Sequence, residues 1–150
     1  AGLTDLKVKG SRQVRLAADM FLRNFRGVPD ALILPGGFSG AKNLAKSAEV
    51  AELIRKMDKG GKIIAAICAS PAIVLAPLGI LNGRKATCYP DCETDFFKNA
   101  VACKDRVVVD GNIITSQGPG TALEFALAIA AQLVGKEIAE TVRSKMLIPS

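Results

Sequence analysis

The sequence contains no histidine and no tryptophan, and it has one tyrosine among its 150 residues. Without histidine, neither a Cys-His pair nor a Ser-His-Asp triad can form within the chain. This excludes ordinary cysteine proteases, α/β-hydrolases and the amidotransferases that pair an elbow cysteine with histidine. It also argues against zinc, since Cys88 and Cys92 have no second close pair beside them. A nucleophile here must work with a carboxylate, a tyrosine, water or a group from elsewhere.

Charge and hydropathy exclude two further classes of protein. The formal net charge is +6, but the lysines and arginines are scattered singly with few aromatic residues between them, so nucleic-acid binding is not predicted. No stretch is long and apolar enough to span a bilayer.

The four cysteines lack the spacing of a disulfide framework, so we expect reduced thiols and a cytoplasmic location. Length and a 49% hydrophobic content predict a single domain over residues 1–150.

Apolar runs alternate with helical patterns, which predicts an α/β fold. Residues 28–34 form an apolar run that stops at Pro-Gly-Gly, a helix capped by Ser47 ends at Gly60-Gly61, and residues 63–67 form a buried parallel strand. A helix is predicted to open at Pro71, followed by a strand at 85–89 and a small helix within 91–102. A hairpin is predicted at 106–116, with Asp110-Gly111 as its type I′ loop. The last two predicted elements are a deeply buried helix that begins at Thr121, with a capping box to Glu124, and a final helix at 137–146.

Cys68 lies between the apolar run 63–67 and Pro71, which favours the start of a helix. The sequence therefore predicts a sharp strand-to-helix turn of the nucleophile-elbow kind, with the small residues Ala66 and Ser70 on either side. Backbone N–H groups at such a turn favour the thiolate, the form that attacks electrophiles and is oxidised by peroxide. The alternative is that Cys68 is a small buried hydrophobic residue, and Cys88, Cys92 and Cys103 are interpreted as structural or secondary redox thiols.

Two glycine-rich loops, LPGGFSG and SQGPGT, each follow a predicted strand, and sites in α/β sheets are built where strands end. The backbone N–H groups of Gly36 and Gly37, with that of Ala69, are candidates for an oxyanion hole beside Cys68. The alternative is that both loops are ordinary turns. Neither loop matches a phosphate-binding or dinucleotide-binding pattern, so no nucleotide is expected.

Four segments carry a resemblance to a known family: LPGG at 34–37, AAICASP at 65–71, TSQGPGT at 115–121 and EFALAI at 124–129. In order and spacing they resemble the ThiJ/PfpI superfamily, and within it the Parkinsonism-associated deglycase (DJ-one-like) branch. The resemblance covers almost the whole chain. It implies a flavodoxin-like three-layer α/β sandwich with a mostly parallel sheet, a homodimer and no cofactor or metal.

The resemblance also implies an activity and a set of site residues. Cys68 is then the nucleophile and peroxide sensor of a glyoxalase that converts methylglyoxal to lactate, or of a deglycase that repairs early glycation adducts. Gly37 and Ala69 take the oxyanion-hole role, and Arg12 reaches the partner's cysteine across the dimer interface. Tyr89 stands where some relatives have histidine. The candidate walls of the site are Tyr89, Gly118 and Pro119.

Three departures from the family accompany the resemblance. The chain begins near the end of the family's second strand, so the family's first strand, first helix and catalytic glutamate have no counterpart. Because a sheet without its first strand leaves unpaired edges, we expect a separate N-terminal segment to supply that glutamate. Tyr89 replaces histidine, and Ser70 stands where glycine or alanine is common. The competing hypotheses are a non-enzymatic sensor whose Cys68 becomes a sulfinate and a chaperone-like dimer without chemistry.

Overall fold

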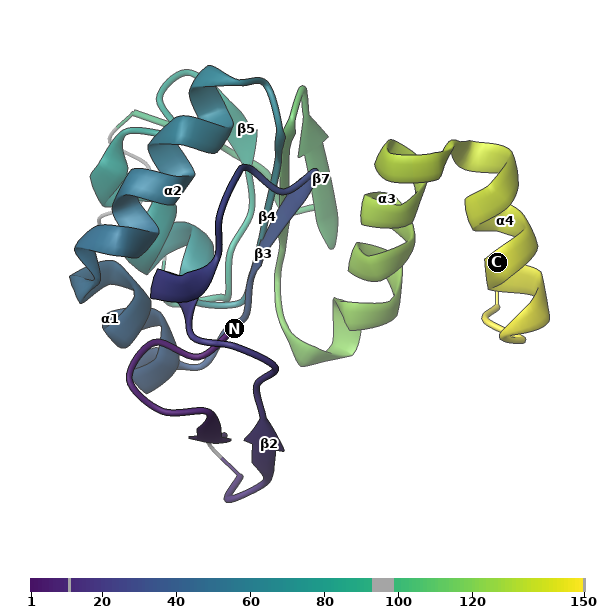
Figure 1. Ribbon diagram of the computed structural model, residues 1–150. Helices are drawn as coiled ribbons and strands as arrows, with labels where there is room; N and C mark the ends of the chain where they lie inside the picture. The colour runs from purple at the N-terminus through teal and green to yellow at the C-terminus, as the bar shows by residue number, and fades with distance from the viewer. Residues whose placement is uncertain (11, 93–98, 150) are drawn as a thin grey trace.

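The computed structural model describes residues 1–10, 12–92 and 99–149 (Figure 1). The strands are β1 Lys7–Lys9, β2 Arg15–Ala17, β3 Ala31–Leu34, β4 Ile63–Ile67, β5 Lys85–Ala86, β6 Val101–Ala102, β7 Val107–Asp110 and β8 Ile113–Ser116. The α-helices are α1 Phe38–Lys46, α2 Ala48–Lys59, α3 Ala122–Val134 and α4 Lys136–Lys145. Short 3-10 turns lie at Leu22–Asn24, Ala76–Leu78 and Pro119–Thr121, and a π-helical turn lies at Pro71–Leu75.

The central sheet has the strand order β3-β4-β8-β7, in which β3, β4 and β8 are parallel and β7 is antiparallel to β8. Leu34 at the end of β3 lies opposite Ala66, and Ile67 at the end of β4 lies opposite Ser116. The three parallel strands therefore end at the same edge of the sheet. The segments that follow them are brought together there.

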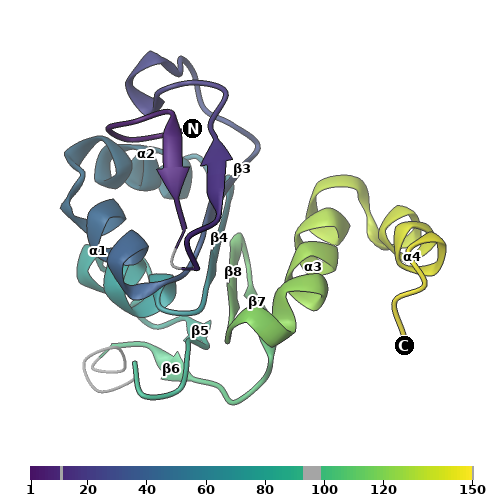
Figure 2. The same cartoon turned by 90° about the horizontal axis from the view of Figure 1, so that it is seen from below.

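Helices cover both faces of this sheet, which confirms the expected three-layer α/β arrangement. Helices α1 and α2 lie on one side of the sheet, α3 lies on the other, and α4 packs outside α3 (Figures 1 and 2). Alternate residues of β4 face the two layers, so Ile64 joins the core beneath α2 with Ile54, while Ala65 joins the core beneath α3 with Phe125. Among the described residues, no helix is long and apolar enough to cross a membrane.

Two N-terminal elements were not predicted from the sequence. Strands β1 and β2 form an antiparallel hairpin that projects from the body of the molecule (Figure 1). Helix α1 occupies residues that carried no helical prediction. Helix α2 and its cap are confirmed, since the Ser47 side chain accepts a hydrogen bond from the Val50 N–H at 3.3 Å.

The segment after Cys68 starts at Pro71 as predicted, but it is not a regular α-helix. A π-helical turn, in which the Ala76 N–H donates to the Pro71 carbonyl, passes into a 3-10 turn. Pro77 explains the irregularity, since it has no N–H to continue an α-helical pattern. The elbow is therefore followed by a short irregular helix.

Helix α3 starts close to the predicted position but differs in burial and capping. It was expected to be deeply buried, yet only Phe125 and Ile129 are buried, while Leu123 is 53% exposed, because one face of the helix packs on the sheet. The predicted capping box is wrong, since the Glu124 carboxylate binds Arg106 instead of the helix start. Gly135 ends α3 and the predicted C-terminal helix is confirmed as α4.

The remaining differences concern the segments around the β7–β8 hairpin. The hairpin is confirmed, but its loop is Gly111-Asn112, because Asp110 pairs with Ile113. Only Gly111 of the two loop residues has a positive φ, so the predicted type I′ turn is wrong as well. The strand predicted at 85–89 is confined to Lys85–Ala86, which pairs with β6. The helix expected within 91–102 falls partly on residues 93–98, outside the described residues, and residues 101–102 form a strand instead.

Candidate active site

Cys68 occupies the strained turn predicted for a nucleophile elbow. Its φ is +65°, a conformation that residues other than glycine adopt rarely and at a cost of about 1–3 kcal/mol. The Cys68 N–H donates to the Ser116 carbonyl at 2.9 Å, and its carbonyl accepts from the Tyr89 N–H at 2.9 Å. The residue is half-buried. Neighbouring segments thus hold the cysteine in a backbone conformation that it would not adopt alone.

The loop after β3 approaches the cysteine as closely as a backbone can. A Cβ atom at Gly36 would lie 2.5 Å from the Cys68 Cβ and 3.2 Å from its Sγ, so a side chain here would force the loop or the elbow to shift. Gly37 has a φ of +86° and forms the N-cap of α1. Glycine is therefore required in this loop for two reasons, the close approach at Gly36 and the positive φ at Gly37.

Each of the two segments that meet at Cys68 carries backbone donors without an internal acceptor in the described part of the chain. Among the described residues, neither the Gly37 N–H nor the Ala69 N–H donates a hydrogen bond. Ala69 itself is buried and follows the cysteine directly. Donors that are held in place without an internal acceptor are the groups that an oxyanion hole requires.

Ser70 links the elbow to the loop after β3. Its side chain is fully buried, and its Oγ donates a 2.5 Å hydrogen bond to the carbonyl of Pro35. Sequence reasoning valued Ser70 for its small size alone and missed this bond. In the sequence, the only sign of this hydrogen bond was the hydroxyl group itself, because alanine or glycine would satisfy the need for a small residue at this position.

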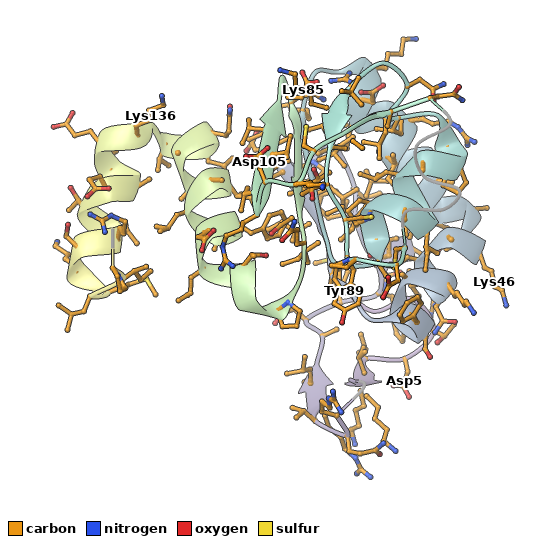
Figure 3. The ribbon with its side chains drawn as sticks, turned by 180° about the vertical axis from the view of Figure 1, so that it is seen from behind. Asp5, Lys46, Lys85, Tyr89, Asp105 and Lys136 are labelled. Atoms are coloured by element: carbon orange, nitrogen blue, oxygen red, sulfur yellow. The ribbon has the colours of Figure 1, made fainter. Side chains whose placement is uncertain are left out.

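Tyr89 and Gly118 meet at the edge of the same site. A Cβ atom at Gly118 would lie 3.2 Å from the Tyr89 Cδ2, so the ring rests against the glycine backbone. The ring is 40% exposed and lies at the edge from which the N-terminal hairpin projects (Figure 3). Pro119 is exposed and begins the 3-10 turn before α3. The structure thus brings together the expected wall residues Tyr89 and Gly118.

A buried chain of hydroxyl groups anchors the Gly118 loop. The Gly118 N–H donates to the Thr121 Oγ1 at 3.1 Å, the Thr121 and Ser116 hydroxyl oxygens are 2.5 Å apart, and the Ser116 Oγ donates to the Arg106 carbonyl at 3.0 Å. The Thr121 Oγ1 also lies 2.9 Å from the Gly118 carbonyl oxygen, so its single proton is donated either to that carbonyl or to the Ser116 Oγ. Sequence reasoning missed this chain, in which the predicted helix cap Thr121 binds the loop before it.

An exposed ion pair fixes the other side of the same loop. The Arg106 Nε contacts both carboxylate oxygens of Glu124, at 2.9 and 3.0 Å, and its Nη2 donates to the Gly120 carbonyl at 2.7 Å. The hydrogen bond from Arg106 lowers the pKa of Glu124. The start of β7 is therefore tied to the first turn of α3.

The other candidate residues lie apart from this arrangement. Arg12 is exposed in the connection between β1 and β2, and no contact between it and Cys68 is found within the described part of the chain. Cys68 and Cys103 form no disulfide within the described part of the chain. Over the described ranges, no three Cys, Asp or Glu side chains gather in a way that would hold a metal ion.

Comparisons with known proteins extend this description. The model of the DJ-1/PfpI family matches residues 1–132. Protein dj-1beta of Drosophila melanogaster is 43% identical over 94% of this chain and 76% of its own length. The "Glutathione-independent glyoxalase DJR-1.2" of Caenorhabditis elegans is 37% identical over 91% of this chain and 73% of its own. Against Protein DJ-1 homolog B of Arabidopsis thaliana the identity is 44%, but the chain spans only 30% of that protein.

Solved structures agree with this fold. The crystal structure of Drosophila melanogaster DJ-1beta superposes with a TM-score of 0.91 at 40% identity, covering 100% of this chain and 82% of that one. The structure titled "Toxoplasma gondii DJ-1, oxidized" superposes with a TM-score of 0.89 at 36% identity, covering 98% of this chain and 80% of that one.

Proposed function

The chain belongs to the DJ-1/PfpI family, and we propose that it acts as a cofactor-independent glyoxalase on methylglyoxal and as a deglycase on methylglyoxal adducts. The observation that carries this proposal is Cys68 at a φ of +65°, held at the end of a central parallel strand. Strain of this kind is stored at functional sites and is hard to explain for a merely structural thiol. The glyoxalase named among the relatives supports the same chemistry.

The reaction follows from the groups around Cys68. The thiolate adds to the aldehyde carbon, which forms a C–S bond and turns the carbonyl oxygen into an oxyanion. The unused N–H groups of Gly37 and Ala69 stabilise that oxyanion. The aldehyde proton then moves from C1 to C2, which leaves a lactyl thioester. Water cleaves the thioester, so that lactate is released and the thiol is restored.

The proton transfer needs an acid/base group that the described site does not contain. Cys68, its loop partners Gly36 and Gly37, and its neighbours Ala69 and Ser70 carry no carboxyl group. We therefore propose that a glutamate on a segment outside these residues carries the proton between C1 and C2. Activity that survives the replacement of each glutamate of the protein in turn would contradict this assignment.

We further propose that the protein works as a homodimer through its projecting hairpin. Val14 is 58% exposed and Leu16 is 63% exposed, which is unusual for apolar residues of a strand pair and typical of an interface. Arg12, at the tip of the same hairpin, would then lie toward the partner. Light scattering tests this proposal, and a Leu16→Asp variant that keeps the wild-type molar mass would overturn it.

The decisive experiment follows lactate from methylglyoxal with the full wild-type protein and its Cys68→Ala and Cys68→Ser variants. Lactate formation by wild type alone is expected, because neither variant offers a thiolate. Equal turnover by the Cys68→Ala variant would refute the mechanism. The same samples incubated with a methylglyoxal hemithioacetal or an aminocarbinol adduct test the deglycase part independently.

A second role rests on the accessibility of the same thiol. Cys68 is only half-buried, and one similar solved structure is titled as oxidised. Two equivalents of peroxide would convert the thiolate to a sulfinate with release of two waters. Mass spectrometry after low peroxide should therefore find two added oxygens on the Cys68 peptide and none on the Cys103 peptide, and oxidation spread evenly over the cysteines would argue against a sensor.

A further inference from the structure

The loop that carries half of the candidate oxyanion hole has few means of holding its own position. Pro35, Gly36 and Gly37 have no polar side chains, and Gly37 sits at a φ of +86°. Within the described part of the chain, the side-chain hydrogen bond that this loop receives comes from Ser70, on the far side of Cys68. Gly36 also packs against Cys68.

We propose that Ser70 is a positioning residue that fixes the oxyanion-hole loop against the nucleophile. Its Oγ donates to the Pro35 carbonyl at 2.5 Å, and the residue is fully buried, so water does not compete for the bond. Ser70 lies two residues after Cys68, and Pro35 lies two residues before Gly37. One hydrogen bond thus sets the separation between the attacking sulfur and the Gly37 donor. This inference rests on the proposed function, in which that separation governs the rate.

The size of the effect follows from how catalysis depends on geometry. A displacement of about 1 Å at a reacting centre costs roughly a hundredfold in rate. Loss of one hydrogen bond in a packed loop should move the Gly37 N–H by a fraction of that distance. We expect the Ser70→Ala variant to lose about tenfold in kcat, with KM within twofold of wild type, because the donor acts on the oxyanion and not on the free aldehyde.

The matched control is Ser47→Ala. This variant makes the same chemical change and also removes a hydroxyl that bonds to the backbone, where Ser47 caps α2 through the Val50 N–H. Ser47 follows the last residue of α1, whereas Gly37 precedes its first residue, so the length of the helix, about 13 Å, separates them. The control should lose thermal stability and keep its kcat.

The test combines lactate kinetics with amide hydrogen exchange on the full protein. In the Ser70→Ala variant, exchange of the Ala41 amide, whose N–H donates to the Gly37 carbonyl at 2.8 Å, should speed up about tenfold, while exchange in β4 stays at the wild-type rate. Ser70→Gly, which also lacks the hydroxyl and adds no bulk, should show the same loss of kcat as Ser70→Ala. Faster exchange throughout β4 would show a general loss of stability and would overturn the positioning role, as would unchanged kcat and exchange. If wild type makes no lactate, the proposed function fails, and the exchange of the Ala41 amide still decides whether Ser70 holds the loop.

Discussion

Replacement of Gly36 by alanine tests the contact on which the candidate site depends. The added Cβ would lie 2.5 Å from the Cys68 Cβ and 3.0 Å from the Ile67 carbonyl oxygen, whereas nonbonded carbons normally lie about 3.5–4.0 Å apart. None of these atoms can rotate away, because a Cβ and a carbonyl oxygen are fixed to the backbone. Either the loop or the elbow must therefore shift by about 1 Å, the distance by which the contact falls short of the usual separation.

A shift of this size has two measurable consequences. Overpacking in a tightly packed region costs about 1–3 kcal/mol, which lowers Tm by roughly 2–12 °C in a domain of this size. A displacement of about 1 Å between the Gly37 donor and Cys68 should also lower kcat/KM for methylglyoxal by around a hundredfold. We expect the loss of activity to persist at temperatures where the variant is fully folded.

Gly40→Ala provides the matched control, since the same change is made four residues further on. Gly40 lies in the first turn of α1, and a Cβ there would meet no atom within 4 Å. Alanine is favoured over glycine in helices by up to about 1 kcal/mol, so this variant should melt slightly above wild type and remain active. Calorimetry and lactate kinetics on both variants decide the matter. A Gly36→Ala variant that melts and turns over like wild type would refute the close approach of loop and elbow.

Two further predictions follow from the backbone strain and from the exposed ion pair. At a φ of +65°, glycine should be better tolerated than alanine, so Cys68→Gly should be more stable to denaturant than Cys68→Ala by about 1 kcal/mol, and the reverse order would show that the turn is unstrained. The pKa of Glu124 is lowered by Arg106, so the pair stabilises the fold at neutral pH and its contribution is lost as pH falls below the ordinary value of 4.5 toward the lowered one. Thermal melts should therefore separate wild type from Glu124→Gln at pH 7 and bring them together in acid, and a constant difference at all pH values would count against this assignment.

The parts of the fold that the sequence predicted are those with strong local signals. The strand Ile63–Ile67 is bounded by Gly60-Gly61 and by the residues leading to Pro71, so its limits could be placed closely. Helix α2 carries both a serine cap and an apolar stripe that packs beneath the sheet. In each case the local pattern and the tertiary environment favour the same structure, which is why the elbow position of Cys68 was predictable.

The parts that sequence reasoning missed depend on contacts between distant segments. Helix α1 has Gly40 in its first turn and buries only Ala41 fully, so its sequence carries little helical signal of its own. The apolar residues of α3 surround the helix, and nothing local indicates that one face alone meets the sheet. In the same way, the acceptor for Ser70 lies 35 residues earlier in the chain, where no periodicity or spacing points to it.

The candidate site combines these two kinds of information. Local sequence determines where a sharp turn can form, because a small residue must stand on each side of Cys68. Yet a cysteine at a φ of +65° relaxes unless other segments oppose it, and here Ser116 and Tyr89 bind its N–H and carbonyl while Gly36 packs against its side chain. Those partners come from the end of β8, from the segment after β5 and from the loop after β3. The geometry of the thiol is therefore a property of the whole sheet edge, and substitutions far from Cys68 in sequence, at Ser70 or Gly36, should alter its chemistry as strongly as substitutions beside it.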